Sequence, residues 1–176
     1  MPSLSNDDIK NLFKLLNNEL ERESVTGEVY LVGGAVMCLV YNARFSTVGV
    51  DALFEPAQRI RKAAVKVAKE AGFDEHWLND AVKGFLSEHG TFDNFIDLSN
   101  LKVYVAQPAY LLATKCLAMR IGVEFHDEND VRYLLRFLNI ESYDQALSVI
   151  TQYYPLDRFP QKTLYALAEL LPDRDR

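Results

Sequence analysis

Residues 29–54, VYLVGGAVMCLVYNARFSTVGVDALF, contain the part of the sequence that decides the fold. The β-branched and aromatic run 28–32 predicts a strand, and the apolar run 34–41 predicts a short buried helix. A second strand is predicted over 48–54. The glycine pair between the first strand and the helix is therefore expected to form a tight turn at the N-terminus of that helix.

The pair Gly33–Gly34 is the first candidate binding feature. A strand-to-helix turn leaves backbone N–H groups unpaired at the positive end of the helix dipole, and a missing Cβ lets a phosphate approach the backbone. The same pair also occurs in tight turns that bind nothing. Arg44 and Thr47 follow in the sequence, and Asp51 lies in the second predicted strand. The presence of a cation, a hydroxyl and a carboxylate near such a turn favours a turn that binds a ligand over one that binds nothing.

The order of these residues resembles a known signature. Two glycines, then R-x-x-T, then V-D-A-L-F are similar to the motif of the DNA polymerase β-like nucleotidyltransferase superfamily. The similarity is greatest to small prokaryotic nucleotidyltransferases of the AbiEii/MenT toxin–antitoxin type. The resemblance implies transfer of NMP from an NTP to a hydroxyl of RNA (tRNA) or protein, with Mg²⁺ as cofactor and a cognate antitoxin as a possible partner. Gly33, Gly34, Arg44 and Thr47 would then bind the nucleotide.

One position departs from this motif. Two acids spaced D-x-D on a strand point to the same face and can bridge two metal ions about 3.5–4 Å apart. This chain has Gly49-Val50-Asp51, so the first acid is absent. Three explanations are open: a degenerate paralogue, a substitution that inactivates a toxic enzyme, or a shifted set of ligands. Glycine is also unfavourable within a strand, which indicates that folding did not select it. We expect Asp51 to be the surviving metal ligand, and transfer to be impaired. A catalytically inactive protein that binds a nucleotide or a partner is the alternative.

A second part of the resemblance lies in residues 108–131, PAYLLATKCLAMRIGVEFHDENDV. The family spacing K-x4-R-x6-D-x2-D is matched there by Lys115, Arg120, Asp127 and Asp130. Lys115 lies in an otherwise apolar helix, and a buried ammonium group needs an anion because burying it alone is costly. A triphosphate or a local acid could supply that anion. The resemblance implies triphosphate contacts for Lys115 and Arg120, whereas the two aspartates could be helix caps or salt-bridge partners.

The resemblance also implies a third carboxylate on a neighbouring strand, which would accept the proton of the attacking hydroxyl. The candidates are Asp97, which precedes the strand predicted over 101–106, and Asp80, in the segment 77–86 (WLNDAVKGFL). Either could equally be an ordinary surface acid. The segment 77–86 is predicted to be a short helix or a turn. The basic face of a helix predicted over 57–71 could receive the acceptor, or it could simply be solvated.

Composition places the chain among ordinary globular proteins. It has 176 residues, of which 49% are hydrophobic and 25% are charged. Its formal net charge of −6 argues against a general affinity for nucleic acid. No stretch approaches the ~18 apolar residues of a membrane span, and the start has no signal-peptide pattern. We therefore expect a cytoplasmic protein with no membrane partner.

The expected fold class is α/β (α+β), a small mixed sheet flanked by helices with a helical C-terminal part. We predict a single domain over 1–176, in which residues 1–107 form the nucleotidyltransferase core and residues 108–176 pack on it. Apolar spacing, caps and proline or glycine breaks predict further helices. These helices are expected over 5–23, 108–122, 127–138, 142–154 and 161–171.

Overall fold

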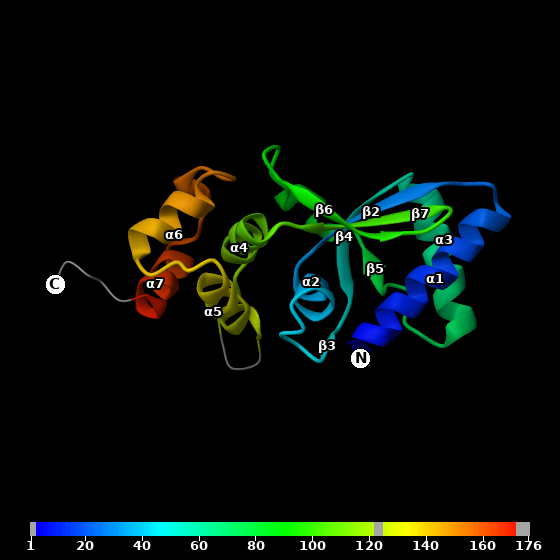
Figure 1. The fold of residues 1–176 in the computed structure, drawn as a ribbon, viewed down its shortest axis with the longest axis horizontal. Coiled ribbons are helices and arrows are strands. Elements are labelled where there is room, and N and C mark those ends of the chain that lie inside the picture. Colours follow the sequence, from blue (N-terminus) through cyan, green and yellow to red (C-terminus); the bar gives the residue numbers. More distant parts are fainter. Residues whose placement is uncertain (1–2, 122–124, 172–176) are drawn as a thin grey trace. The chain divides into compact units, whose positions relative to one another are not determined.

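The structure is a computed structural model that describes residues 3–121 and 125–171 (Figure 1). It contains helices and a mixed sheet, which confirms the predicted α/β class. None of the helices in these two ranges is long and apolar enough to cross a membrane.

The chain divides into two compact units. The first consists of Met1–Gly84 and Phe92–Ala106, and the second of Phe85–Thr91 and Gln107–Arg176. We predicted one domain with an internal boundary after residue 107. The observed boundary after Ala106 lies next to the predicted one, but a short segment from the first half of the sequence also belongs to the second unit.

A five-stranded mixed sheet forms the first unit, with strand order β5-β4-β2-β7-β6. Its strands are β2 (Gly27–Val32), β4 (Val50–Glu55), β5 (Leu78–Asn79), β6 (Phe92–Asp97) and β7 (Leu101–Ala106). The central strand β2 runs antiparallel to β4 and parallel to β7. At the edges, β5 is parallel to β4 and β6 is antiparallel to β7. A separate antiparallel pair joins β1 (Leu4–Ser5) to β3 (Ser46–Thr47).

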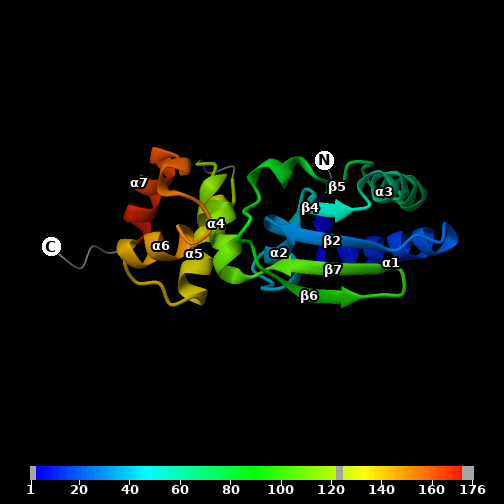
Figure 2. The ribbon, with the colours of Figure 1, turned by 90° about the horizontal axis from the view of Figure 1, so that it is seen from above.

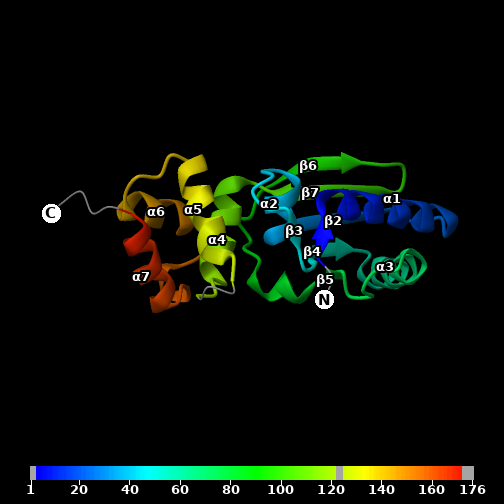
Figure 3. The ribbon, with the colours of Figure 1, turned by 90° about the horizontal axis from the view of Figure 1, so that it is seen from below.

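Helices α1 (Asn6–Arg22) and α3 (Ala57–Ala71) pack on each other and on one face of the sheet (Figure 2 and Figure 3). Helix α1 begins with a capping box. The Ser5 hydroxyl accepts from the Asp8 backbone N–H at 3.1 Å, and the Ser5 backbone N–H donates to the Asp8 carboxylate at 2.9 Å. Helix α3 has the predicted bounds because Gly72, with φ 79°, takes the left-handed conformation that ends it.

The two faces of the sheet differ in burial. On β4, Val50, Ala52 and Phe54 are buried on the side of the helices, whereas Asp51 and Leu53 are half-buried. Because side chains alternate along a strand, Asp51 and Leu53 point to the opposite face. We call this the open face, since neither α1 nor α3 lies over it (Figure 2).

Two strands of the five-stranded sheet differ from the predictions. The strand β6 was not predicted. The segment predicted as a helix or turn over 77–86 contains β5, followed by a 3₁₀ helix over Ala81–Phe85. These differences add strands at both edges of the sheet, so the sheet is wider than the sequence indicated.

The second unit is helical, as predicted. Its helices are α4 (Pro108–Leu117), α5 (Asp127–Phe137), α6 (Tyr143–Ile150) and α7 (Gln161–Leu170). Helix α4 packs on α5 and α6, and α6 packs on α7. The Ser142 hydroxyl caps α6 by accepting from the Gln145 backbone N–H at 3.2 Å. The predicted end of α4 at Gly122 lies outside the described residues, and the helix itself ends earlier, at Leu117.

Contacts with tyrosines explain why the segment Phe85–Thr91 belongs to the second unit. The Ser87 backbone N–H donates to the Tyr110 hydroxyl at 3.0 Å, and the Ser87 hydroxyl donates to the Tyr153 carbonyl at 2.5 Å. A Cβ on Gly90 would lie only 2.3 Å from the Tyr110 ring. The segment is therefore packed directly against α4 through Tyr110.

Candidate nucleotide site and buried ion cluster

The turn after β2 requires both of its glycines. Gly33 has φ 75° and ψ −154°, a conformation that residues with a Cβ rarely adopt. Gly34 begins α2 (Gly34–Leu39), and a Cβ there would lie 2.1 Å from Nη1 of Arg44. The first glycine is therefore needed for its backbone conformation, and the second for the close approach of a guanidinium group.

Three of the predicted site residues lie against this turn. The Arg44 guanidinium group packs on Gly34, and Thr47 Oγ1 lies 3.0 Å from the position of a Cβ on the same residue. Asp51 Oδ2 lies 3.2 Å from the position of a Cβ on Gly33. The structure thus brings together the two glycines, the arginine, the threonine and the aspartate that the motif indicated. We call these five residues the glycine-turn site.

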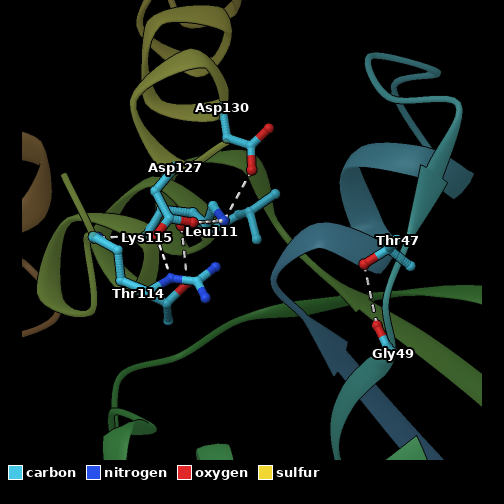
Figure 4. Close-up of polar contacts among 8 residues, drawn as sticks. Thr47, Gly49, Leu111, Thr114, Lys115, Asp127 and Asp130 are labelled. Carbon is cyan, nitrogen blue, oxygen red and sulfur yellow. Dashed lines mark hydrogen bonds and ion pairs between the residues drawn. The ribbon is translucent and has the colours of Figure 1, made fainter. Parts of the chain in front are cut away.

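Position 49 does not need glycine. Gly49 has no positive φ, and a Cβ there would lie 3.4 Å from the Trp77 carbonyl oxygen and 3.8 Å from Asn79 Nδ2. Both distances are ordinary van der Waals contacts. The Thr47 hydroxyl donates to the Gly49 carbonyl at 3.2 Å, and this bond involves no side chain at position 49 (Figure 4). A Cβ atom therefore fits at this position without strain.

Asn79 is a neighbour of the site that the sequence did not reveal. Strands β4 and β5 pair in parallel, with Asp51 opposite Asn79, so the two side chains share the open face. A side chain at position 49 would also extend toward this amide. The two-residue strand β5 is too short to show a periodic pattern, and the strand pairing could not be read from the local sequence.

The residues at the turn do not fit a pair of magnesium ions. A two-metal centre needs carboxylates that bridge the ions, and Asp51 is the only acid in the glycine-turn site. Across residues 3–121 and 125–171, no group of three or more His, Cys, Asp or Glu side chains could hold a metal ion. Asp51, predicted as the surviving metal ligand, is thus the one carboxylate of the glycine-turn site.

Asp97 is misplaced for a third carboxylate, which corrects that prediction. The sheet aligns Asp97 with Lys102, and Lys102 with Glu28, at one end of β2. Asp51 is aligned with Val32 at the other end. Along the strand direction, the distance from Val32 to Glu28 is about 13 Å at ~3.3 Å per residue. Across the sheet, the strands β2 and β7 lie between β4, which carries Asp51, and β6, which carries Asp97. Asp97 therefore cannot share a metal ion or a substrate atom with Asp51.

Asp80 has a different environment. Its Oδ2 lies 2.6 Å from Arg61 Nη2 and 3.8 Å from Lys83 Nζ. Both basic side chains are well exposed. These contacts match the alternative of an ordinary surface acid in an ion pair.

Lys115, in the second unit, has two carboxylates beside it. Its Nζ lies 2.9 Å from Asp127 Oδ1 and 2.9 Å from Asp130 Oδ2 (Figure 4). The three side chains are 10%, 5% and 3% exposed, respectively. Arg120 adds a second cation, because its Nε and its backbone N–H both donate to Asp127 Oδ2 at 2.9 Å. We call these four residues the buried ion cluster.

The cluster satisfies Lys115 with local acids, the alternative to a triphosphate. Burial alone would raise the pKa of Asp127, but hydrogen bonds from Arg120 and Lys115 lower it to about 2. Helix α4 ends at Leu117, so Arg120 lies outside the helix and reaches Asp127 from the following segment. The cluster already compensates the charges of Lys115 and Arg120. The triphosphate contacts that the resemblance implies for these two residues stay a prediction.

Comparison of the chain with protein-family models, with curated proteins and with solved structures found no match.

Proposed function

We propose that this chain binds an NTP at the glycine-turn site and is a nucleotidyltransferase whose transfer activity is impaired by Gly49. The observation that carries the proposal is the convergence of Arg44, Thr47 and Asp51 on the Gly33–Gly34 turn. These are the residue types that bind a phosphate chain and position its reacting group. They also occur in the order of the motif that the sequence resembles.

Each group has a distinct role in this proposal. The Arg44 guanidinium group, which packs on Gly34, supplies paired donors that match phosphate oxygens. Thr47 adds a hydroxyl, and Asp51 adds the carboxylate nearest to the turn. The acceptor would be a hydroxyl of RNA, such as a tRNA end, or of protein, and the chain would be the toxin of a toxin–antitoxin pair. The motif resemblance alone supports these last assignments.

The impairment follows from the missing acid. Active relatives of this type would use Mg²⁺, and Asp51 is the one carboxylate proposed to hold it in this chain. Losing a shared metal ligand removes several kcal/mol of transition-state stabilisation, which lowers the rate on the order of 10³-fold. NTP binding should suffer less, because the glycine backbone and Arg44 do not depend on position 49.

The test compares Gly49→Asp with Gly49→Asn, which has nearly the same size but no charge. Transfer from a labelled NTP into total RNA and total protein should appear with Gly49→Asp and stay at the level of the unmodified chain with Gly49→Asn. Equal, negligible transfer by both variants would refute the proposal.

A second candidate is a catalytically inactive protein that binds a nucleotide or a partner. It is favoured by the glycine-turn site, in which Asp51 is the one carboxylate. Titrating an NTP with and without magnesium separates the candidates. An impaired transferase should bind more tightly with magnesium and lose that gain in Asp51→Asn, whereas the second candidate predicts no magnesium effect.

A further inference from the structure

Three aromatic rings form a row across adjacent strands of the first unit. The Tyr30 and Tyr104 rings are stacked, with centroids 4.9 Å apart and planes inclined by 11°. The Phe92 ring meets Tyr30 edge to face, with centroids 5.2 Å apart. All three residues are half-buried, so each of them keeps some solvent-accessible surface. We call these residues the aromatic row, and their strands β2, β7 and β6 lie close together in Figure 2.

The register places the aromatic row on the same face as Asp51. Val32 is aligned with Asp51, and Tyr30 with Leu53, and directly opposed residues point to one side of a sheet. Tyr30 is also aligned with Tyr104 on β7. The Cα atom of Tyr30 lies about 7 Å along the strand and one strand spacing of ~4.8 Å across from that of Asp51. The distance between the Cα atoms of Tyr30 and Asp51 is thus comparable to the length of one nucleotide.

The row is held in place before any ligand arrives. The Tyr30 hydroxyl donates to Glu28 Oε2 at 2.5 Å. This hydrogen bond, together with burial and the charge of Glu28, raises the pKa of Tyr30 to about 12. The phenol is therefore neutral at physiological pH, and its ring is fixed between a hydrogen bond and a stacked neighbour.

We propose that the aromatic row stacks a nucleobase. This inference rests on the proposed function, because it places the base next to the phosphate-binding groups. Aromatic rings can stack on any base, because every base has a π-face. A nucleotide bound on the open face of the sheet could therefore place its base against the row. The net charge of −6 disfavours a long polyanionic strand. The base would come from the bound NTP or from the terminal nucleotide of an acceptor RNA.

The first experiment distinguishes the contribution of the base to NTP affinity from that of the phosphates. The affinity for each NTP is compared with that for inorganic triphosphate in the unmodified chain, in Tyr104→Leu and in Tyr104→Phe. If the row holds the base of the NTP, the preference for NTP over inorganic triphosphate should fall about 5- to 100-fold in Tyr104→Leu. It should be retained in Tyr104→Phe, which keeps the ring. Tyr165→Leu is the matched control, because Tyr165 is 70% exposed on α7 and loses the same group.

The second experiment tests the acceptor as the source of the base. A short single-stranded RNA is compared with the same oligonucleotide carrying an abasic 3′-terminal position. If the row holds the acceptor base, Tyr104→Leu should abolish the preference for the intact end and leave the NTP preference unchanged. Phe92→Leu, on the edge strand β6, is a second variant that should act in the same direction, and far-UV circular dichroism checks that each variant is folded.

The outcomes distinguish this inference from the proposed function. If inorganic triphosphate does not bind the unmodified chain, the glycine-turn site fails, while the oligonucleotide comparison still decides on the aromatic row. If folded Tyr104→Leu and Phe92→Leu alter neither the NTP preference nor the oligonucleotide preference, the row does not bind a base and the inference is overturned.

Discussion

Replacing Lys115 by methionine would remove one of the two cations from the buried ion cluster. The methionine side chain has a similar length and no charge, so the apolar packing of α4 is largely kept. Asp130, 3% exposed, would lose the ammonium group 2.9 Å from its Oδ2, while Asp127 would keep its hydrogen bonds from Arg120. The perturbation therefore acts mainly on one buried carboxylate.

Removing one partner of a buried ion pair costs about 3–5 kcal/mol, because the remaining charge is left in a poorly solvated place. Arg120 still compensates Asp127, so we expect the lower end of this range, about 3 kcal/mol. The double variant Lys115→Met/Asp130→Leu should regain much of the loss, because an apolar pair of similar volume leaves no unpaired charge.

The free energy of unfolding is measured by urea denaturation followed by circular dichroism. Lys83→Met is the matched control, because Lys83 is 66% exposed, forms only a 3.8 Å ion pair with Asp80, and should cost less than about 1 kcal/mol. A loss in Lys115→Met no larger than in this control would refute the structural role of the cluster. If Lys115→Met then weakened triphosphate binding, Lys115 would have the ligand-binding role that the motif implies and not a structural role.

Two further predictions concern the turn and the cluster. Gly34→Ala would place a Cβ 2.1 Å from Arg44 Nη1, so the guanidinium group must move. The affinity for inorganic triphosphate should then fall at least about 10-fold. An unchanged affinity in a calorimetric titration would contradict the role of Arg44. Because the pKa of Asp127 is lowered to about 2, its ionised form stabilises the fold above about pH 4, and this stabilisation is lost as the pH falls through 2. The difference in unfolding free energy between the unmodified chain and Asp127→Asn should therefore shrink by about 2 kcal/mol between pH 4 and pH 2, and a constant difference would count against the cluster.

Elements with local signals could be predicted from the sequence. Helix α3 has its predicted bounds because Pro56 precedes it and Gly72 ends it, and β7 has them because its residues alternate before Pro108. The strand β6 gave no such signal. It lies at the sheet edge, and an irregularity between Asn94 and Ile96 breaks its alternation.

The same difference between local and long-range signals applies to the residues of the candidate site. The glycine-turn site could be predicted because its members, from Gly33 to Asp51, are close in sequence and follow a motif. The assignment of Asp97 failed because its position depends on strand order and register, which are set by pairing between distant segments. The aromatic row was missed for the same reason, since Tyr30 and Tyr104 become neighbours only through the pairing of β2 with β7.

The central claim is that the glycine-turn site is a nucleotidyltransferase site that lacks one carboxylate. The most direct measurement is the initial rate of labelled NMP transfer by Gly49→Asp, with Gly49→Asn and Gly49→Asp/Asp51→Asn measured in parallel. We predict a rate on the order of 10³-fold above the unmodified chain for Gly49→Asp alone, and no gain for the other two. A correctly folded Gly49→Asp that transfers no faster than Gly49→Asn would contradict the claim.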